Sequence, residues 1–442
     1  MQGLEPRSIK MASARSILSN WSIANWWNSK RSVIWTYALV AFGVRIGTCL
    51  ALKTYQFDSW RDHWAFGFEW GRIAKWLVET NMYTLDGSSA GTITEPLYPF
   101  IIAAFFYVFG IFTANAAFAL IVFQSVVDSI TVWVVFDLAE KIYGPVEARV
   151  AALLFALYPA SVFFAVGRIG PSGITVLLVC LVLLITFRLA ESARFKSAIL
   201  AGSLTGLLLL AASHPLSLIF IVPLWLLWVG RNQRLRMFVV SVIFVGSAIL
   251  VTTPWAVRNS LTVGEPTMAK TGLGAMLWRG NNPSATGYTL IRFPGGKPGP
   301  EDRVYLKMAL AWIVENPTDF VILTLKRVVI FWSVIPRSAS TIELLNGLFF
   351  VLAMALGLIG AWWPPETKPE RVWLLFLFLA IFPIVFYLTV ISHYRYRYYV
   401  EPLMLILASR GIHRLWRILA RPAVIVLAGR DSLNLASRMD PT

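Results

Sequence analysis

The chain has 442 residues, of which 57% are hydrophobic and 14% are charged, and its formal net charge at pH 7 is +16. Long uncharged runs in a chain of this composition exclude an ordinary soluble protein and indicate a polytopic membrane protein. The basic excess does not indicate nucleic-acid binding, because Lys and Arg gather in short segments between apolar runs, where positive charge orients membrane spans.

The N-terminal segment 1–31 holds five basic residues and no small-residue cleavage pattern, so we interpret it as a cytoplasmic segment and not as a cleaved signal peptide. The apolar run 32–52 has the ~20 residues that cross about 30 Å of hydrocarbon. The sequence predicts an all-α polytopic membrane domain over 32–420, with about 11–12 transmembrane helices, and a cytoplasmic tail over 421–442. Further apolar runs lie near 97–113, 116–136, 148–166, 172–189, 196–213, 216–229, 237–255, 343–363, 373–391 and 399–409.

Basic clusters predict which connections face the cytoplasm. These clusters are at 188–196 and 231–236, and six Arg follow position 409. Counting spans back from them puts the connection 141–147 in the cytoplasm, whereas counting forward from the N-terminus puts it outside. A broken or re-entrant segment within 97–172 would remove this disagreement, and the sequence Gly-Arg-Ile-Gly-Pro at 167–171 is our candidate.

The first extracytoplasmic loop, 53–96, is polar, acidic and aromatic. Ile73, Trp76 and Leu77 recur at helical spacing, which predicts a short helix along the membrane surface with Glu69 just before it. The loop carries six of the chain's 23 acidic residues, namely Asp58, Asp62, Glu69, Glu79, Asp86 and Glu95.

The second extracytoplasmic loop, 256–336, is rich in Gly and Pro up to a helical stretch predicted at about 301–316. The apolar stretch 320–335 is interrupted by Lys326 and Arg327. We interpret it as an interfacial helix, because counting it as a span would put the Arg-rich C-terminus outside.

The order of motifs in the first loop resembles that of the integral-membrane glycosyltransferases that use lipid-linked sugars. An acid and an aromatic run come first, then Gly-Arg-Ile-Ala, then Pro-Leu-Tyr-Pro, and then an apolar run that ends at Phe109 and Gly110. The similarity is to the GT-C superfamily, in particular glycosyltransferase family 39, the protein O-mannosyltransferase-like and aminoarabinose-transferase-like group. Two shorter matches are Pro-Trp with Arg-Asn at 254–259 and the alternating Tyr and Arg at 394–398.

The resemblance implies that an Asp or Glu of the first loop acts as general base on the acceptor while the sugar leaves a polyprenyl phosphate. Glu69 is our first choice, because it lies at the entrance to the Gly-Arg-Ile-Ala helix. Many relatives open this loop with adjacent Asp-Glu, whereas here the acids are spread out, so Asp62 and Asp58 are alternatives. The competing interpretation of Glu69 is a solvated carboxylate paired with Arg72.

Asp62 and His63 are candidate ligands for a divalent metal, although neighbouring side chains point apart and other ligands would be needed. The simpler interpretation is that both are polar loop residues facing water. The sequence indicates no firm cofactor. Cys49 and Cys180 lie in apolar segments and indicate neither a disulfide framework nor a zinc cluster.

Binding of the departing phosphate requires cations on the outer side, and a guanidinium suits bidentate contact with a phosphate. The candidates for binding the phosphate are Arg258, Arg395 and Arg397, and Arg279 is also placed outside. The alternating Tyr and Arg residues have a competing interpretation, in which they form an aromatic and basic belt that anchors a span. The candidates for the acceptor site or cavity wall are His63, Arg72 and Tyr98. His214 has the simpler interpretation of a satisfied histidine at a helix end. Arg45 and Asp128 lie within apolar runs and are expected to face the bundle interior.

The sequence thus predicts a glycosyltransferase that moves a hexosyl or pentosyl group from a polyprenyl-phosphate donor to an extracytoplasmic lipid, glycan or protein. The expected partners are that donor and the membrane lipids, and the expected location is the bacterial inner membrane with the active site outside. The competing hypothesis is a lipid or polysaccharide transporter or flippase. It would place charged or glycine-broken residues along several spans at mid-depth, whereas the polar content here is concentrated in two loops.

Overall fold

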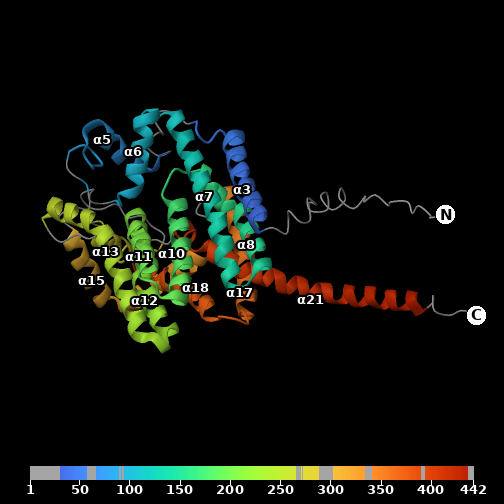
Figure 1. Ribbon diagram of the computed structural model, residues 1–442. Coiled ribbons are helices and arrows are strands. Elements are labelled where there is room, and N and C mark those ends of the chain that lie inside the picture. The colour runs from blue at the N-terminus through green and yellow to red at the C-terminus, as the bar shows by residue number, and fades with distance from the viewer. Residues whose placement is uncertain are drawn as a thin grey trace, which may run out of the picture.

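The computed structural model describes residues 30–56, 66–88, 91, 94–264, 270, 272–287, 302–333, 341–389 and 394–436, with backbone only for Lys30, Arg31, Phe68, Val263, 341–343, 394–395 and 421–436. Every regular element in these ranges is a helix (Figure 1), which confirms the all-α membrane class. The helices of the bundle are α3 (Lys30–Leu52), α6 (Leu97–Phe109), α7 (Ala114–Ile142), α8 (Pro145–Leu157), α9 (Pro159–Val166), α10 (Ser172–Ser192), α11 (Phe195–Ala211), α12 (Leu218–Val229), α13 (Arg234–Val263), α17 (Thr341–Trp362), α18 (Glu370–Ile381), α19 (Ile384–Thr389) and α21 (Glu401–Ala436).

Six helices among the described residues are long and apolar enough to cross a membrane, or eight if each of two bent pairs counts as one span. Three shorter apolar helices accompany them, at Leu97–Phe109, Phe195–Ala211 and His214–Val229. The sequence predicted about 11–12 spans. This number is higher because hydropathy detects the shorter apolar helices as readily as the helices that are long enough to cross the membrane.

One end of the bundle, which we call the basic end, gathers connections that are far apart in the sequence. Glu191 pairs with Lys141, Lys368 and Arg371, which joins the loops after α7, α10 and α17. Glu147 pairs with Arg410 of α21, at 2.7 Å. The connection 141–147 therefore lies beside 188–196, as the count back from the basic clusters predicted.

The forward count was wrong because α6 does not extend to the basic end. Its 13 residues rise about 20 Å, less than the ~30 Å of a hydrocarbon core. Glu95, just before α6, bonds Ser213 beyond the far end of α11, and a turn over Gly110 joins α6 to the start of α7. Both ends of α6 thus lie away from the basic end, with α5 (Arg72–Thr80), at the top of Figure 1.

The proposed break at 167–171 is instead the turn between α9 and α10, held by Gln124, whose Nε2 donates to Ala165 O at 2.6 Å. The bend within a span lies one helix earlier, where α8 and α9 meet at 46° around Tyr158 and Pro159. Proline removes a backbone donor there, and the Phe155 carbonyl accepts hydrogen bonds from the Ser161 hydroxyl at 3.0 Å and from Tyr158 N at 3.3 Å.

Arg45 and Asp128 are partners in the bundle interior, both almost fully buried. Arg45 Nε donates to Asp128 Oδ2 at 3.0 Å, and its other nitrogens bond Ala156 O and Ser161 Oγ at the α8–α9 bend. A buried charge is tolerated when it is paired and hydrogen-bonded, so this network joins α3, α7 and the bend.

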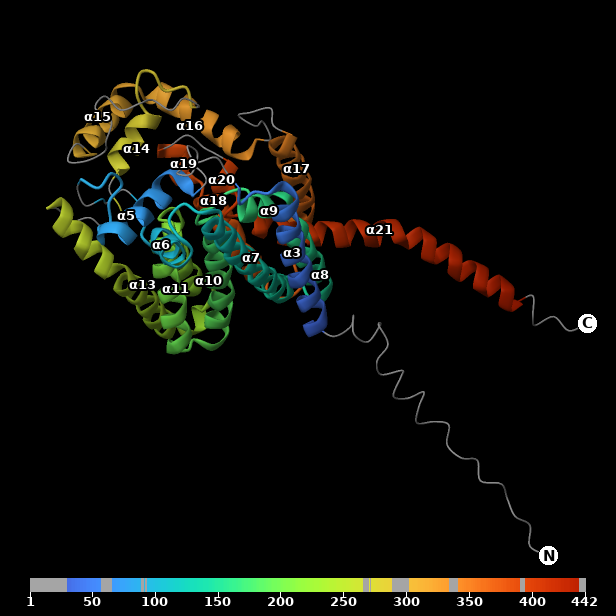
Figure 2. The same cartoon turned by 90° about the horizontal axis from the view of Figure 1, so that it is seen from above.

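The second loop contributes α14 (Leu273–Gly280), α15 (Asp302–Glu315) and α16 (Pro317–Trp332), which lie along one side of the bundle (Figure 2). The helix predicted at about 301–316 is α15. It meets α16 at 106°, so the two are not one straight span. The first part of α21 is buried, whereas the rest of this helix extends away from the bundle in both views.

Candidate active site

Glu69 lies in a π-helical turn, Gly67–Gly71, immediately before α5. Its carboxylate is exposed and accepts a hydrogen bond from Thr94 Oγ1 at 3.3 Å. The turn itself is well packed, because Phe66 is buried and the Trp70 ring lies 6.1 Å from the ring of Tyr98. The backbone therefore holds Glu69 firmly while its carboxylate stays open to an incoming molecule.

Glu95 is the buried acid of this end of the molecule. Its Oε1 accepts hydrogen bonds from Lys270 Nζ at 2.8 Å, Ser213 N at 2.9 Å and Ser213 Oγ at 2.6 Å. Burial raises the pKa of Glu95, but the charges of Lys270 and His214 and these hydrogen bonds outweigh it and lower the pKa to about 2. Glu95 is thus a permanent carboxylate that ties the two loops together, a role that the sequence analysis did not assign to it.

Lys270 and Arg279 are cations of the second loop that interact electrostatically with Glu69. Burial would lower the pKa of Lys270, but Glu95, with smaller contributions from Tyr396 and Glu69, raises it. Burial lowers the pKa of Arg279, which Tyr396 and Glu69 oppose. The charge of Glu69 therefore acts on both cations. The side chain of Lys270 is 28% exposed.

His214 begins a 3₁₀ turn, His214–Ser217, between α11 and α12. Its ring stacks on Phe386 of α19 at 5.0 Å between centroids and lies 4.9 Å from the ring of Tyr396. Because His214 also contributes to the low pKa of Glu95, it is part of the same cluster.

Of the predicted phosphate-binding arginines, Arg258 and Arg397 bond protein groups in this structure. Arg258 donates to the carbonyls of Gly91 and Tyr83, and its guanidinium lies 4.9 Å from the Trp255 ring. It therefore joins the end of α13 to the first loop.

Arg397, in the short helix α20 (Tyr394–Arg397), is buried and pairs with Glu401 at 2.7 Å. It also donates to Ser333 O at 2.8 Å. The side chain of Arg395 lies outside the described residues. Of the cations of the second loop, Lys270 and Arg279 are those that interact electrostatically with Glu69.

Asp58, Asp62 and His63 fall outside the described residues, so the predicted metal site is not placed. Within the part of the chain that the structure describes, no group of three or more His, Cys, Asp or Glu could hold a metal ion. Arg72 is the first residue of α5, and Tyr98 is buried beneath Trp70, where its hydroxyl donates to Gln124 Oε1.

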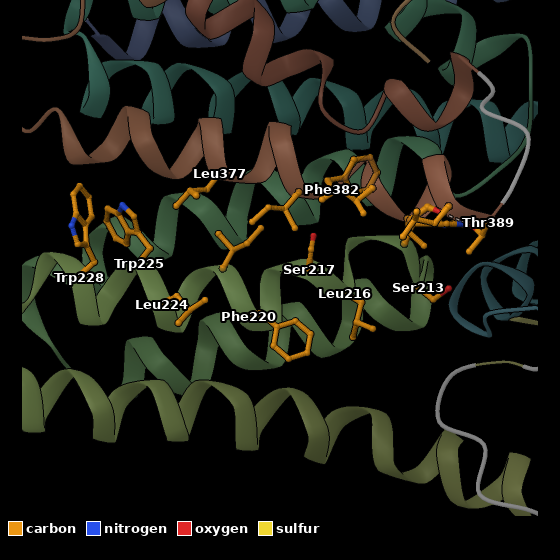
Figure 3. Close-up of a pocket in the computed structure, with 16 residues that line it drawn as sticks. Ser213, Leu216, Ser217, Phe220, Leu224, Trp225, Trp228, Leu377, Phe382 and Thr389 are labelled. Carbon is orange, nitrogen blue, oxygen red and sulfur yellow. Dashed lines mark hydrogen bonds between the residues drawn. The ribbon is translucent and has the colours of Figure 1, made fainter. Parts of the chain in front are cut away.

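An apolar groove of about 540 Å³ leads away from this cluster. Figure 3 shows Ser213 and Thr389 at one end of it and Trp225 and Trp228 at the other. Its walls are the 3₁₀ turn and α12 on one side and α18 and α19 on the other, and they include Leu216, Phe220, Leu224, Leu377, Ile381, Phe382 and Leu388. From residue 213 to residue 228 the groove is roughly 20 Å long at the helical rise. It therefore runs along α12 from the Glu95–Lys270 cluster toward the basic end, where Trp225 Nε1 donates to Glu370 O at 2.8 Å.

The pKa of Glu95 predicts a pH dependence of stability. Because its pKa is below the ordinary value of 4.5, the folded state binds fewer protons there than the unfolded state does. The ionised carboxylate then stabilises the fold fully above pH 4.5, and this stabilisation is lost as the pH falls toward 2. We expect the melting temperatures of the wild type and Glu95→Gln in detergent to converge over this window. A constant difference would contradict the pairing of Glu95 with Lys270.

The comparisons with known proteins agree with this fold. The family model described as dolichyl-phosphate-mannose-protein mannosyltransferase matches residues 93–257. The archaeal oligosaccharyltransferase AglB from Archaeoglobus fulgidus, in complex with an inhibitory peptide and a dolichol-phosphate, superposes with a TM-score of 0.53 at 12% identity, over 91% of this chain and 52% of that chain. The apo oligosaccharyltransferase of the same organism gives 0.55 at 14% identity, over 92% and 52%.

ArnT from Cupriavidus metallidurans bound to undecaprenyl phosphate superposes with a TM-score of 0.51 at 14% identity, over 92% of this chain and 64% of that chain. No curated protein sequence matches this chain. The chain spans about half the length of the oligosaccharyltransferases it matches. The resemblance to the lipid-linked-sugar glycosyltransferases that the first loop indicated is thus confirmed, by the family match and by the fold.

Proposed function

We propose that this protein is a membrane glycosyltransferase that moves a sugar from a polyprenyl-phosphate donor to an acceptor on the extracytoplasmic face of a bacterial inner membrane. One observation carries the proposal. An apolar groove along α12 leads to a cluster in which an exposed carboxylate, Glu69, interacts electrostatically with two cations, Lys270 and Arg279. The groove suits a lipid tail, the two cations suit a phosphate, and the carboxylate suits the activation of a nucleophile.

The groove suits an isoprenoid tail because its lining is almost wholly hydrocarbon and aromatic, and because several of its residues are also exposed to the surrounding lipid. Leu216, Phe220 and Leu224 are 48%, 62% and 66% exposed, so a tail could enter sideways from the bilayer. Each buried methylene contributes ~0.8 kcal/mol to binding. The dolichol-phosphate of AglB and the undecaprenyl phosphate of ArnT are ligands of the same chemical class.

In the proposed reaction, Glu69 takes the proton of the acceptor hydroxyl or amine while the acceptor atom forms a bond to the anomeric carbon of the sugar. The bond from that carbon to the phosphate oxygen breaks, and its electron pair leaves with the polyprenyl phosphate. Lys270 and Arg279 stabilise the charge that develops on this phosphate. Glu95 is a poor base, because a carboxylate with a pKa of about 2 that is bonded to Lys270 has little tendency to accept a proton.

The transporter hypothesis is weaker on two grounds. Charged residues buried in the described part of the bundle, such as Arg45 with Asp128 and Arg397 with Glu401, are paired with each other. The groups that converge with Glu69 lie instead at the end opposite the basic end, and the fold is that of known lipid-linked-sugar transferases.

A substitution that fills part of the groove tests the proposal. Ser217 lines the middle of the groove (Figure 3), and Ser217→Trp would displace part of the tail. Loss of about two buried methylenes costs ~1.6 kcal/mol, so we expect the KM for a long-chain polyprenyl-phosphate sugar to rise roughly tenfold with little change in kcat. A donor with a single isoprene unit should be used equally well by both enzymes.

The matched control is Leu250→Trp, at a residue of α13 that is 72% exposed and lies outside the groove. Purified protein in nanodiscs, assayed against a panel of radiolabelled polyprenyl-phosphate sugars, supplies the readout. Transfer from a nucleotide sugar but from no lipid-linked sugar would contradict the proposed function. An unchanged KM for the long-chain donor in Ser217→Trp would place the tail elsewhere.

A further inference from the structure

We infer that Arg327 of α16 is a positioning residue for the donor phosphate: it holds the end of α14 against the end of α19 and thereby sets where Arg279 lies relative to the groove. This inference rests on the proposed function. Arg327 is fully buried, and the guanidinium bonds groups of two helices that border the site.

The guanidinium of Arg327 bonds the last turns of both helices. Its Nη1 donates to Tyr387 O of α19 at 2.7 Å, and its Nη2 donates to Gly280 O of α14 and to Asn281 Oδ1 at 3.1 Å. Carbonyls in the last turn of a helix have no partner within the helix and carry partial negative charge. One cation therefore satisfies the ends of two helices at once.

Asn281 completes the joint from the other side. Its buried side-chain amide donates to Leu277 O of α14 at 2.9 Å and to Leu388 O of α19 at 2.8 Å. The two backbones are also in close contact, since a Cβ at Gly280 would lie 2.4 Å from Thr389 O. No side chain larger than that of glycine fits between the helices at this point.

This joint links the proposed phosphate ligand to the tail groove. Arg279 immediately precedes Gly280 on α14, while Leu388 and Thr389 line the groove on α19. A phosphate attached to a tail in the groove has a fixed position, so Arg279 must be held at the matching distance to contact it. A guanidinium can bridge two carbonyls with its planar fork, whereas a lysine ammonium is a single point donor on a flexible stem. Arg327→Lys should therefore keep the buried charge and loosen the joint.

The test compares Arg327→Lys with Lys326→Met, which removes the neighbouring exposed cation of the same helix. Binding of polyprenyl phosphate to the full chain in nanodiscs is measured directly, together with the melting temperature and the donor KM. We expect Arg327→Lys to raise the Kd and the donor KM roughly tenfold, with kcat changed less than threefold, and Lys326→Met to leave them near the wild-type values. A merely structural role would lower the melting temperature and the active fraction without moving the Kd.

A double-mutant cycle with Arg279→Met decides whether Arg327 acts through Arg279. We expect Arg327→Lys to have little further effect on the Kd once Arg279 is methionine. If the wild type binds polyprenyl phosphate and Arg327→Lys binds it equally well, or if the two substitutions are additive, the positioning role is refuted and the proposed function stands. If the wild type does not bind polyprenyl phosphate at all, the proposed function itself fails.

Discussion

Replacement of Glu69 by Gln is expected to lower kcat by about 10²–10⁴-fold, with expression, melting temperature and donor affinity close to those of the wild type. The carboxylate is exposed and bonded only weakly, at 3.3 Å, to Thr94 Oγ1, so the isosteric amide removes the base without disturbing the packing beneath it. Turnover with saturating donor and acceptor, and the Kd for polyprenyl phosphate, are the measurements.

Glu79→Gln is the matched control. Glu79 is also exposed, on the same surface helix, where it pairs with Lys75 at 3.8 Å. Near-wild-type turnover of Glu69→Gln together with an inactive Asp58→Asn or Asp62→Asn would move the base into the segment 57–65. Full activity of all three variants would remove the first loop from the active site.

Loss of the two cations is expected to abolish donor binding. A hydrogen bond to a charged group contributes about 1.5–3 kcal/mol, so Lys270→Met and Arg279→Met should each raise the donor Kd roughly ten- to hundredfold, and the double variant should show no saturable binding. The physical reason is that both cations come from the second loop and interact electrostatically with Glu69, beside which we propose that the phosphate leaves.

Lys270→Met also leaves Glu95 buried without its partner, which costs stability as well as donor affinity. The variant with both Lys270→Met and Glu95→Gln separates the two effects, because it removes the buried charge. We expect it to recover most of the lost melting temperature but none of the lost donor affinity. Wild-type affinity in this double variant would show that Lys270 serves only to neutralise Glu95.

The class of fold and the importance of the first loop could be predicted from local patterns. Apolar runs predicted the membrane bundle, and the spacing of Ile73, Trp76 and Leu77 predicted the helix that the structure shows at Arg72–Thr80. The acids Glu301 and Asp302, which follow Pro300, placed the start of α15 within a few residues. These features depend on residues close together in the chain.

The partners of the site residues could not be predicted, because they depend on contacts between distant segments. Lys270 reaches Glu95 across the two loops, and Arg45 reaches Asp128 across 83 residues of sequence. Hydropathy also failed to show that α6 stops short of the basic end, since it measures how apolar a helix is and not how deep it extends.

Two of the arginines assigned to the phosphate also carried a local signal for a structural contact. Arg397 is followed four residues later by Glu401, the spacing of an ion pair on one helix face, and that pair forms at 2.7 Å. Arg258 follows Trp255 by three residues on α13, and its guanidinium lies over that ring. An arginine with a partner already present at helical spacing is a weaker candidate for a ligand site.

Photoaffinity labelling tests the proposed donor site most directly. A polyprenyl phosphate that carries a diazirine in its first isoprene units would be bound to the full chain in nanodiscs, activated by light and mapped by peptide mass spectrometry. We predict labels on the 3₁₀ turn and start of α12, including Leu216 and Phe220, and on Leu388 of α19, all suppressed by excess unlabelled polyprenyl phosphate and reduced in the Lys270→Met, Arg279→Met double variant. Labels spread over the lipid-facing surfaces of α13 or α17, with no suppression by unlabelled ligand, would contradict it.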